Sequence, residues 1–154
     1  MKNILLTLVF LFASFGLTTI RAAELSLDQY RDQIVYVDFW ASWCIPCKKS
    51  FPWMNKMHQK YKDQGLKIIA INVDENPTDA DKFLAENPAK FEIMRDPEGG
   101  LAKKYKLVGM PTSLLFDTQG KLVSRHVGFK KGDVEGYETD LKKLLPDTAQ
   151  TSTE

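Results

Sequence analysis

The segment from residue 34 to residue 47 places the strongest constraint on the fold. Residues 34–40, Ile-Val-Tyr-Val-Asp-Phe-Trp, are nearly all β-branched or aromatic, which is typical of a strand that is buried on both faces. The next three residues predict a turn into a helix over residues 44–63, where apolar side chains recur at helical spacing. Cys44 is therefore expected at the start of a helix, one turn before Cys47.

The remaining pattern predicts alternating strands and helices. The expected strands are residues 67–73, 91–94, 113–116 and 122–127, and the expected helices are residues 77–86, 97–105 and 132–145. Asp-Thr-Gln-Gly at residues 117–120 predicts a hairpin turn, and Ser26 is expected to cap one helical turn within residues 25–33. Pro52 should kink the long helix and Gly65 should end it. This succession predicts a mixed sheet with helices on both faces.

The N-terminal residues predict an export signal. Lys2 precedes an uncharged stretch over residues 4–20, and small residues follow at Ala22 and Ala23. The residues around the expected cleavage position match the usual cleavage pattern poorly. The apolar stretch also approaches the length that spans a bilayer, so an uncleaved membrane anchor is the alternative. We expect a signal or anchor over residues 1–23, one domain over 24–146 and a flexible polar tail over 147–154, all outside the cytoplasm.

The charge balance gives no reason to expect a nucleic-acid partner. Removal of Lys2 and Arg21 leaves 19 of the 21 basic residues against 20 acidic residues, a net charge near −1. The lysines at residues 103–106 and 130–131 read as solvated faces, and His58 and His126 are each isolated, which favours packing or surface positions over metal binding.

Cys44 and Cys47 are the only cysteines, so all sulfur chemistry lies in Cys-Ile-Pro-Cys. A disulfide across so short a loop removes little chain entropy, which favours a reversible dithiol–disulfide switch over a structural staple. A zinc site and an inert pair are the alternatives, but the chain has two histidines and no second cysteine pair. No metal is expected, and no cofactor besides the redox-active disulfide.

The positions of the two cysteines predict different roles. A helix N-terminus should lower the pKa of Cys44 and make it the attacking thiolate, while the more buried Cys47 resolves the mixed disulfide. Pro46 stiffens the first turn without needing an N–H group. Asp38 lies on the buried strand, where an apolar setting raises a carboxyl pKa and equips it to exchange a proton with Cys47. The alternative is a strand-end acid bonded to nearby backbone.

Four motifs in order resemble thioredoxin-like proteins, specifically the exported TlpA/ResA-type thiol-disulfide oxidoreductases. They are residues 37–48, Pro52, Gly-Met-Pro-Thr at 109–112 and Val-Gly at 127–128, and the resemblance covers about residues 25–145. It implies an α/β thioredoxin-like fold with a central mixed sheet flanked by helices on both faces. Residues 76–96 resemble the helix–strand insertion of the TlpA/ResA branch.

The resemblance also implies further site residues. Glu75 matches an acid near the active site of ResA-type proteins, although it can equally be a loop acid. Pro111 matches a cis proline that faces the disulfide and leaves neighbouring backbone open to an extended substrate, although it can equally open the following strand. Met110 would then join Trp43, Ile45 and Pro46 in an apolar docking surface. Trp43 can equally be a core residue, and Trp53 is expected to be structural.

Two features depart from the branch that the chain resembles. Its members usually carry an N-terminal β-hairpin, for which residues 24–33 are too short, and many lack an acid at the position of Asp38, which instead matches plain thioredoxin.

The resemblance implies an enzyme in the periplasm or at the extracytoplasmic membrane face that reduces disulfides in exported proteins, such as apocytochrome c. Its dithiol would be restored by a membrane reductant of the DsbD/CcdA type. One alternative is an oxidant that installs disulfides, although Ile45-Pro46 resembles the reducing branch more. Another is a non-catalytic binding module, which would have no need of a paired thiol.

Overall fold

The computed structural model describes residues 25–146 of the 154-residue chain. The predicted signal or anchor over residues 1–23 and the predicted tail over 147–154 lie outside the described residues. The described chain folds around one five-stranded sheet in the order β3-β2-β1-β4-β5. The strands are β1 Ile34–Trp40, β2 Leu66–Asn72, β3 Glu92–Arg95, β4 Thr112–Phe116 and β5 Leu122–Val127.

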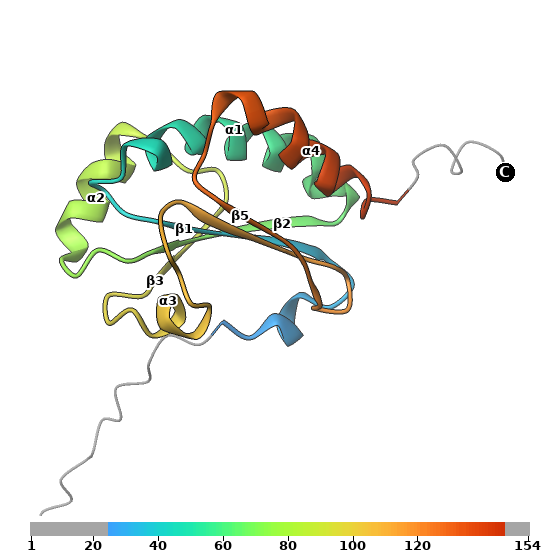
Figure 1. Ribbon diagram of the computed structural model, residues 1–154, viewed down its shortest axis with the longest axis horizontal. Helices are drawn as coiled ribbons and strands as arrows, with labels where there is room; N and C mark the ends of the chain where they lie inside the picture. The colour runs from blue at the N-terminus through green and yellow to red at the C-terminus, as the bar shows by residue number, and fades with distance from the viewer. Residues whose placement is uncertain (1–24, 147–154) are drawn as a thin grey trace, which may run out of the picture.

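Strands β1, β2 and β3 run parallel, whereas β4 pairs antiparallel with β1, and β5 antiparallel with β4. The predicted mixed sheet is therefore confirmed. The helices are α1 Ile45–Tyr61, α2 Pro77–Glu86, α3 Gly100–Lys104 and α4 Val134–Lys142, and the short 3-10 helices are η1 Leu27–Tyr30, η2 Lys62–Gln64 and η3 Lys131–Asp133. Figure 1 shows α1 and α4 over one face of the sheet, with α3 and the N-terminal η1 on the other. Among residues 25–146, no helix has the length and apolar character needed to span a membrane.

Strand β1 occupies the middle of the sheet, and all seven of its residues are buried. Its side chains alternate between two cores, with Tyr36 and Trp40 on the face covered by α1 and with Val37 and Phe39 on the opposite face. Asp38 shares the face of Tyr36 and Trp40 because strand side chains repeat every second residue. The centre of the sheet thus presents a carboxyl toward α1.

An aromatic cluster joins α1 and α2 to β1. The Phe51 ring lies 5.0 Å from the Trp40 ring, 5.0 Å from the Phe83 ring and 5.4 Å from the Phe91 ring, all in edge-on geometry. These contacts fix the first half of α1 against the end of β1, where the two cysteines lie.

Local signals explain most helix ends. Asn76 caps α2 by accepting a hydrogen bond from the Thr78 amide at 3.1 Å, and Gly65, with φ 91°, follows the last turn of η2. Helix α3 begins three residues later than predicted because Gly99 has a left-handed conformation, with φ 67°. The predicted Ser26 cap is wrong, since its side chain makes no capping hydrogen bond to η1.

Candidate active site

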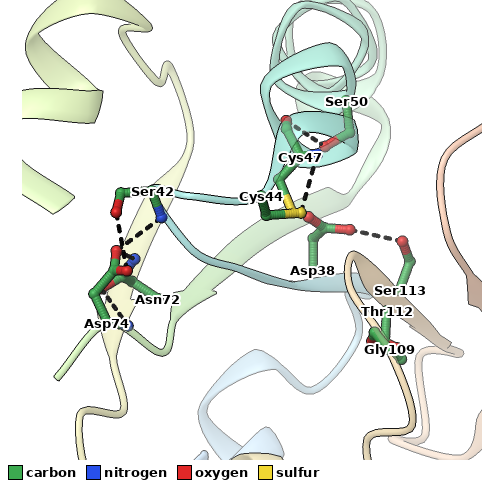
Figure 2. The surroundings of a disulfide bond; sticks show 10 residues. All are labelled: Asp38, Ser42, Cys44, Cys47, Ser50, Asn72, Asp74, Gly109, Thr112 and Ser113. Atoms are coloured by element: carbon green, nitrogen blue, oxygen red, sulfur yellow. Dashed lines mark hydrogen bonds between the residues drawn. A yellow bond between two sulfur atoms is a disulfide. The ribbon is translucent and has the colours of Figure 1, made fainter. Parts of the chain in front are cut away.

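The cysteine pair lies where β1 passes into α1. A turn joins the two elements through a hydrogen bond from the Cys44 amide to the Ala41 carbonyl at 3.1 Å. Cys44 is the N-cap of α1 and is joined to Cys47 by a disulfide, with the two Cα atoms 5.2 Å apart. The Cys47 amide donates to the Cys44 sulfur at 3.3 Å (Figure 2). Cys44 is 5% exposed and Cys47 is 0% exposed, so the exposed part of the pair belongs to Cys44.

Asp38 lies fully buried on β1, beneath the start of α1. Its Oδ1 accepts a hydrogen bond of 2.7 Å from the Ser113 hydroxyl, while its Oδ2 is buried without a hydrogen-bond partner among the described residues. Burial raises the pKa of Asp38 to about 7, and the Ser113 hydrogen bond partly offsets that rise. Because the partner is a side chain from β4, the alternative of an acid bonded to nearby backbone is wrong. In Figure 2 the carboxyl points toward the disulfide.

Apolar side chains surround the disulfide at the surface. Trp43 is 69% exposed and Ile45 is 73% exposed, so the alternative of Trp43 as a core residue is wrong. Pro46 and Met110 are half-buried and Pro111 is buried, and the Met110–Pro111 peptide bond is cis. Val108, two residues before Met110, is also 82% exposed.

A second buried carboxylate holds the turn before Cys44. Asp74 is 6% exposed and accepts hydrogen bonds from the Ser42 amide at 2.9 Å, the Ser42 hydroxyl at 3.0 Å and the Asn72 amide group at 2.7 Å. Figure 2 shows these three bonds converging on one carboxylate. The end of β2 is thereby tied to the turn that presents Trp43 and Cys44.

Glu75, the acid identified from the sequence, takes no part in that arrangement. Its side chain is exposed, and within residues 25–146 the structure gives it no hydrogen bond or ion pair. Sequence reasoning missed Asp74 because the run Asp74-Glu75-Asn76 reads as an ordinary polar loop. The position of Asp74 two residues after the buried β2 strand was the one available signal.

The remaining candidates lie elsewhere in the fold. Trp53 packs in the core with its ring 5.6 Å from that of Tyr36, as a structural role predicts. His126 lies 3.0 Å from the Ser124 hydroxyl and 3.2 Å from the Asp140 carboxylate. Half-buried His58 has a pKa lowered by burial, with a further contribution from nearby lysines. Across residues 25–146, no three His, Cys, Asp or Glu side chains gather closely enough to hold a metal ion.

Comparisons with known proteins agree with this geometry. The profile of the AhpC/TSA family matches residues 11–125. The thiol-disulfide oxidoreductase ResA of Bacillus thuringiensis subsp. konkukian is 34% identical over 134 residues, which cover 86% of this chain and 76% of the relative. ResA of Geobacillus kaustophilus is 33% identical over 129 residues, covering 83% and 74%.

Two solved structures extend the likeness to the backbone. A Chlorobium tepidum protein described as a DsbE thiol:disulfide interchange protein superposes with a TM-score of 0.76 and 47% identity, over 78% of this chain and 85% of that one. StoA from Bacillus subtilis gives a TM-score of 0.62 and 27% identity, over 71% and 82%.

Proposed function

We propose that this protein works as a reductant of disulfides in exported proteins. The premise is that the chain belongs to the AhpC/TSA family and is a ResA-like thiol-disulfide oxidoreductase. The observation that carries the proposal is the asymmetry of the cysteine pair. Cys44, at a helix N-terminus, keeps a small exposed area of 5%, whereas Cys47 is 0% exposed on the same side of the sheet as the carboxyl of Asp38.

In the first step the Cys44 thiolate attacks one sulfur of a substrate disulfide. A bond forms between Cys44 and that sulfur, the substrate disulfide breaks, and the second substrate sulfur leaves as a thiolate that takes a proton from water. The Cys47 amide, which donates to the Cys44 sulfur in the disulfide state, can donate to the thiolate in the same way. The start of α1 thus stabilises the attacking form.

In the second step Asp38, as a carboxylate, takes the proton from the Cys47 thiol. The Cys47 thiolate then attacks Cys44, the mixed disulfide breaks, and the remaining substrate sulfur leaves as a thiolate that is protonated by water. The substrate gains two electrons and the enzyme pair loses two. Asp38 returns its proton to Cys47 when the pair is next reduced. A pKa of about 7 suits a group that both accepts and returns a proton near neutral pH.

Substrate docking is assigned to the apolar surface around the disulfide. Trp43 and Ile45 expose large apolar area beside Cys44, and a substrate that covers them gains the free energy of removing that area from water. Pro46, Met110 and Pro111 complete the surface, with the backbone beside Pro111 as the place for an extended substrate segment.

Glu75 is proposed as a second acid of the exchange reaction. The support is its place directly after Asp74, whose carboxylate holds the turn before Cys44, and its exposed side chain. Glu75→Gln should slow exchange without changing the equilibrium reduction potential, and Glu98→Gln on another loop is the matched control. Equal rates for both variants would remove Glu75 from the mechanism.

The place of action is proposed from the N-terminal sequence. A signal or anchor over residues 1–23 would deliver the domain to the periplasm or to the extracytoplasmic membrane face, where the compartment drives thiols toward disulfides. Apocytochrome c is one fitting substrate. The oxidised pair would then be reduced again by a membrane partner of the DsbD/CcdA type.

The equilibrium reduction potential of the Cys44–Cys47 couple tests the direction of exchange. The domain is equilibrated with glutathione or dithiothreitol mixtures and followed by tryptophan fluorescence, to which Trp43 contributes. A potential of about −270 mV supports a reductant, and a potential of about −120 mV would favour the alternative of an oxidant. Failure of the pair to cycle would leave only a binding module.

The roles of the two cysteines have a separate test. Cys47→Ser should accumulate a mixed disulfide with an oxidised peptide, because the resolving thiol is missing. Cys44→Ser should form none, since Cys47 is 0% exposed. Equal trapping by the two variants would contradict the proposed order of attack.

A further inference from the structure

Ser113 is the residue that holds the carboxyl of Asp38. The two residues are direct register partners on β4 and β1, so their side chains lie on the same face of the sheet. Asp38 is 0% exposed and Ser113 is 4% exposed, and the Ser113 hydroxyl donates to Oδ1 at 2.7 Å. A charge-assisted hydrogen bond in such a water-poor place is among the stronger ones that a side chain can make.

This bond makes the two oxygens of Asp38 unequal. Oδ1 is occupied by Ser113, whereas Oδ2 is buried with no hydrogen-bond partner in the described part of the chain. Figure 2 shows one carboxyl oxygen directed to Ser113 and the carboxyl as a whole facing the sulfurs. An unpaired buried oxygen is costly, and its retention beside a reactive group points to use in the reaction.

We propose that Ser113 is a positioning residue that fixes the carboxyl of Asp38 so that Oδ2 receives the proton of Cys47. The inference rests on the proposed function and deepens it. The hydroxyl acts in two ways: it stops rotation of the carboxyl, and it stabilises the ionised form that can accept a proton. With the hydroxyl removed, burial acts on Asp38 unopposed and the carboxyl becomes a poorer proton acceptor at neutral pH.

Other ionisable groups around Asp38 also have to be considered. Tyr36 on β1 and Tyr137 on α4 both have phenol pKa values raised chiefly by burial, so both are neutral near pH 7. His126 on β5 is the register partner of Ser113 and lies against Asp140, while Ala70, the partner of Asp38 on β2, does not ionise. The cysteine pair on α1 does not titrate while it is oxidised.

The test compares Ser113→Ala, Ser113→Thr and Ser113→Val in the oxidised protein. Thr and Val have nearly the same shape, so this matched pair differs only in the hydroxyl. The Asp38 carboxyl is titrated by carbon NMR, with Asp38→Asn identifying its signal. Loss of the hydrogen bond should move the Asp38 midpoint upward by about one to two pH units in the Ala and Val variants, while the Thr variant stays near the wild type.

A kinetic measurement separates positioning from a merely structural role. In single-turnover reduction of a disulfide peptide at pH 7, attack by Cys44 should proceed at the wild-type rate in the Val variant. Resolution by Cys47 should slow by about 5- to 50-fold, the loss of ionised Asp38 that such a midpoint shift gives. Ser113→Thr should restore the resolution rate.

Two results would overturn the inference. One is an Asp38 midpoint that is the same in the wild-type, Ala and Val proteins, and the other is equal slowing of both steps. A wild-type protein that fails to reduce the peptide at all would instead refute the proposed function, whatever the titrations give. The Thr and Val pair keeps the test decisive if the Ala variant does not fold.

Discussion

Replacing Asp38 with asparagine should stabilise the protein at neutral and alkaline pH. Well below pH 3.8 the carboxyl is neutral in the folded and the unfolded chain, so its ionisation contributes nothing to the free energy of unfolding. As the pH rises, the unfolded chain ionises at its ordinary pKa of 3.8, while the folded protein keeps the proton until about pH 7. The unfolded state therefore loses its proton first, and the free energy of unfolding falls across this window.

The size of the effect follows from the two pKa values. They differ by about three pH units, and at about 1.4 kcal/mol per unit the ionised carboxyl costs the folded state about 4 kcal/mol above pH 7. Asparagine keeps the shape and can still accept the Ser113 hydrogen bond, but its Nδ2 group stays unpaired where Oδ2 lies. That residual penalty reduces the expected gain to about 2–4 kcal/mol at pH 8, with little difference from wild type at pH 4.

Urea unfolding of both oxidised proteins from pH 4 to pH 8.5, followed by the fluorescence of buried Trp40 and Trp53, measures this difference. Subtracting one curve from the other cancels every other titrating group. Asp74→Asn is the control, because that carboxylate accepts three hydrogen bonds and an amide would turn a donor toward a donor. It should destabilise the protein. A difference between Asp38→Asn and wild type that does not change with pH would refute the reasoning about burial.

Three further predictions concern the surroundings of the disulfide. Asp74→Ala should lower the free energy of unfolding by about 1–3 kcal/mol in urea titrations and slow attack by Cys44, because the turn at Ser42 loses its hydrogen-bond acceptor. An unchanged attack rate would show that the turn does not affect the reaction of Cys44. Trp43→Ala should raise KM for a disulfide peptide while changing stability by less than about 0.5 kcal/mol, since this side chain is 69% exposed; a large loss of stability would contradict its surface position. Phe51→Ala should cost about 3–5 kcal/mol in the same unfolding assay, because Phe51 is 1% exposed and contacts three aromatic rings; a loss below about 1 kcal/mol would mean that the aromatic cluster repacks.

Local sequence patterns were sufficient for the elements that build the site. The apolar run over residues 34–40 predicts β1 because a strand buried on both faces needs apolar residues at nearly every position. Helix α2 was predicted with its observed bounds because Asn76 and Pro77 are strong start signals and Asn87-Pro88 is a strong stop. Helix α3 begins at Gly100 and not at the predicted residue 97, because no local pattern marks the left-handed conformation that Gly99 takes.

The contacts between distant residues could not be predicted in the same way. The Ser113–Asp38 hydrogen bond joins residues 75 apart in sequence, and it depends on the register of β4 against β1. The Asp74–Ser42 bonds span 32 residues and depend on where two parallel strands end beside each other. Which of two distant strands pair, and which residues then lie opposite each other, is not set within any one segment of the sequence. The residues that position the chemistry were therefore harder to find than the two cysteines that perform it.

The different exposure of the two sulfurs determines the order in which the enzyme can react with its partners. Because Cys47 is 0% exposed and only Cys44 of the pair keeps any exposed area, every partner must react at Cys44. Electron donor and electron acceptor cannot be bound together, so turnover has to alternate between them, and an excess of either one blocks the other. Kinetics with two varied substrates should then give parallel reciprocal plots, the pattern of a ping-pong reaction. A molecule that covers Cys44 would stop both halves of the cycle at once.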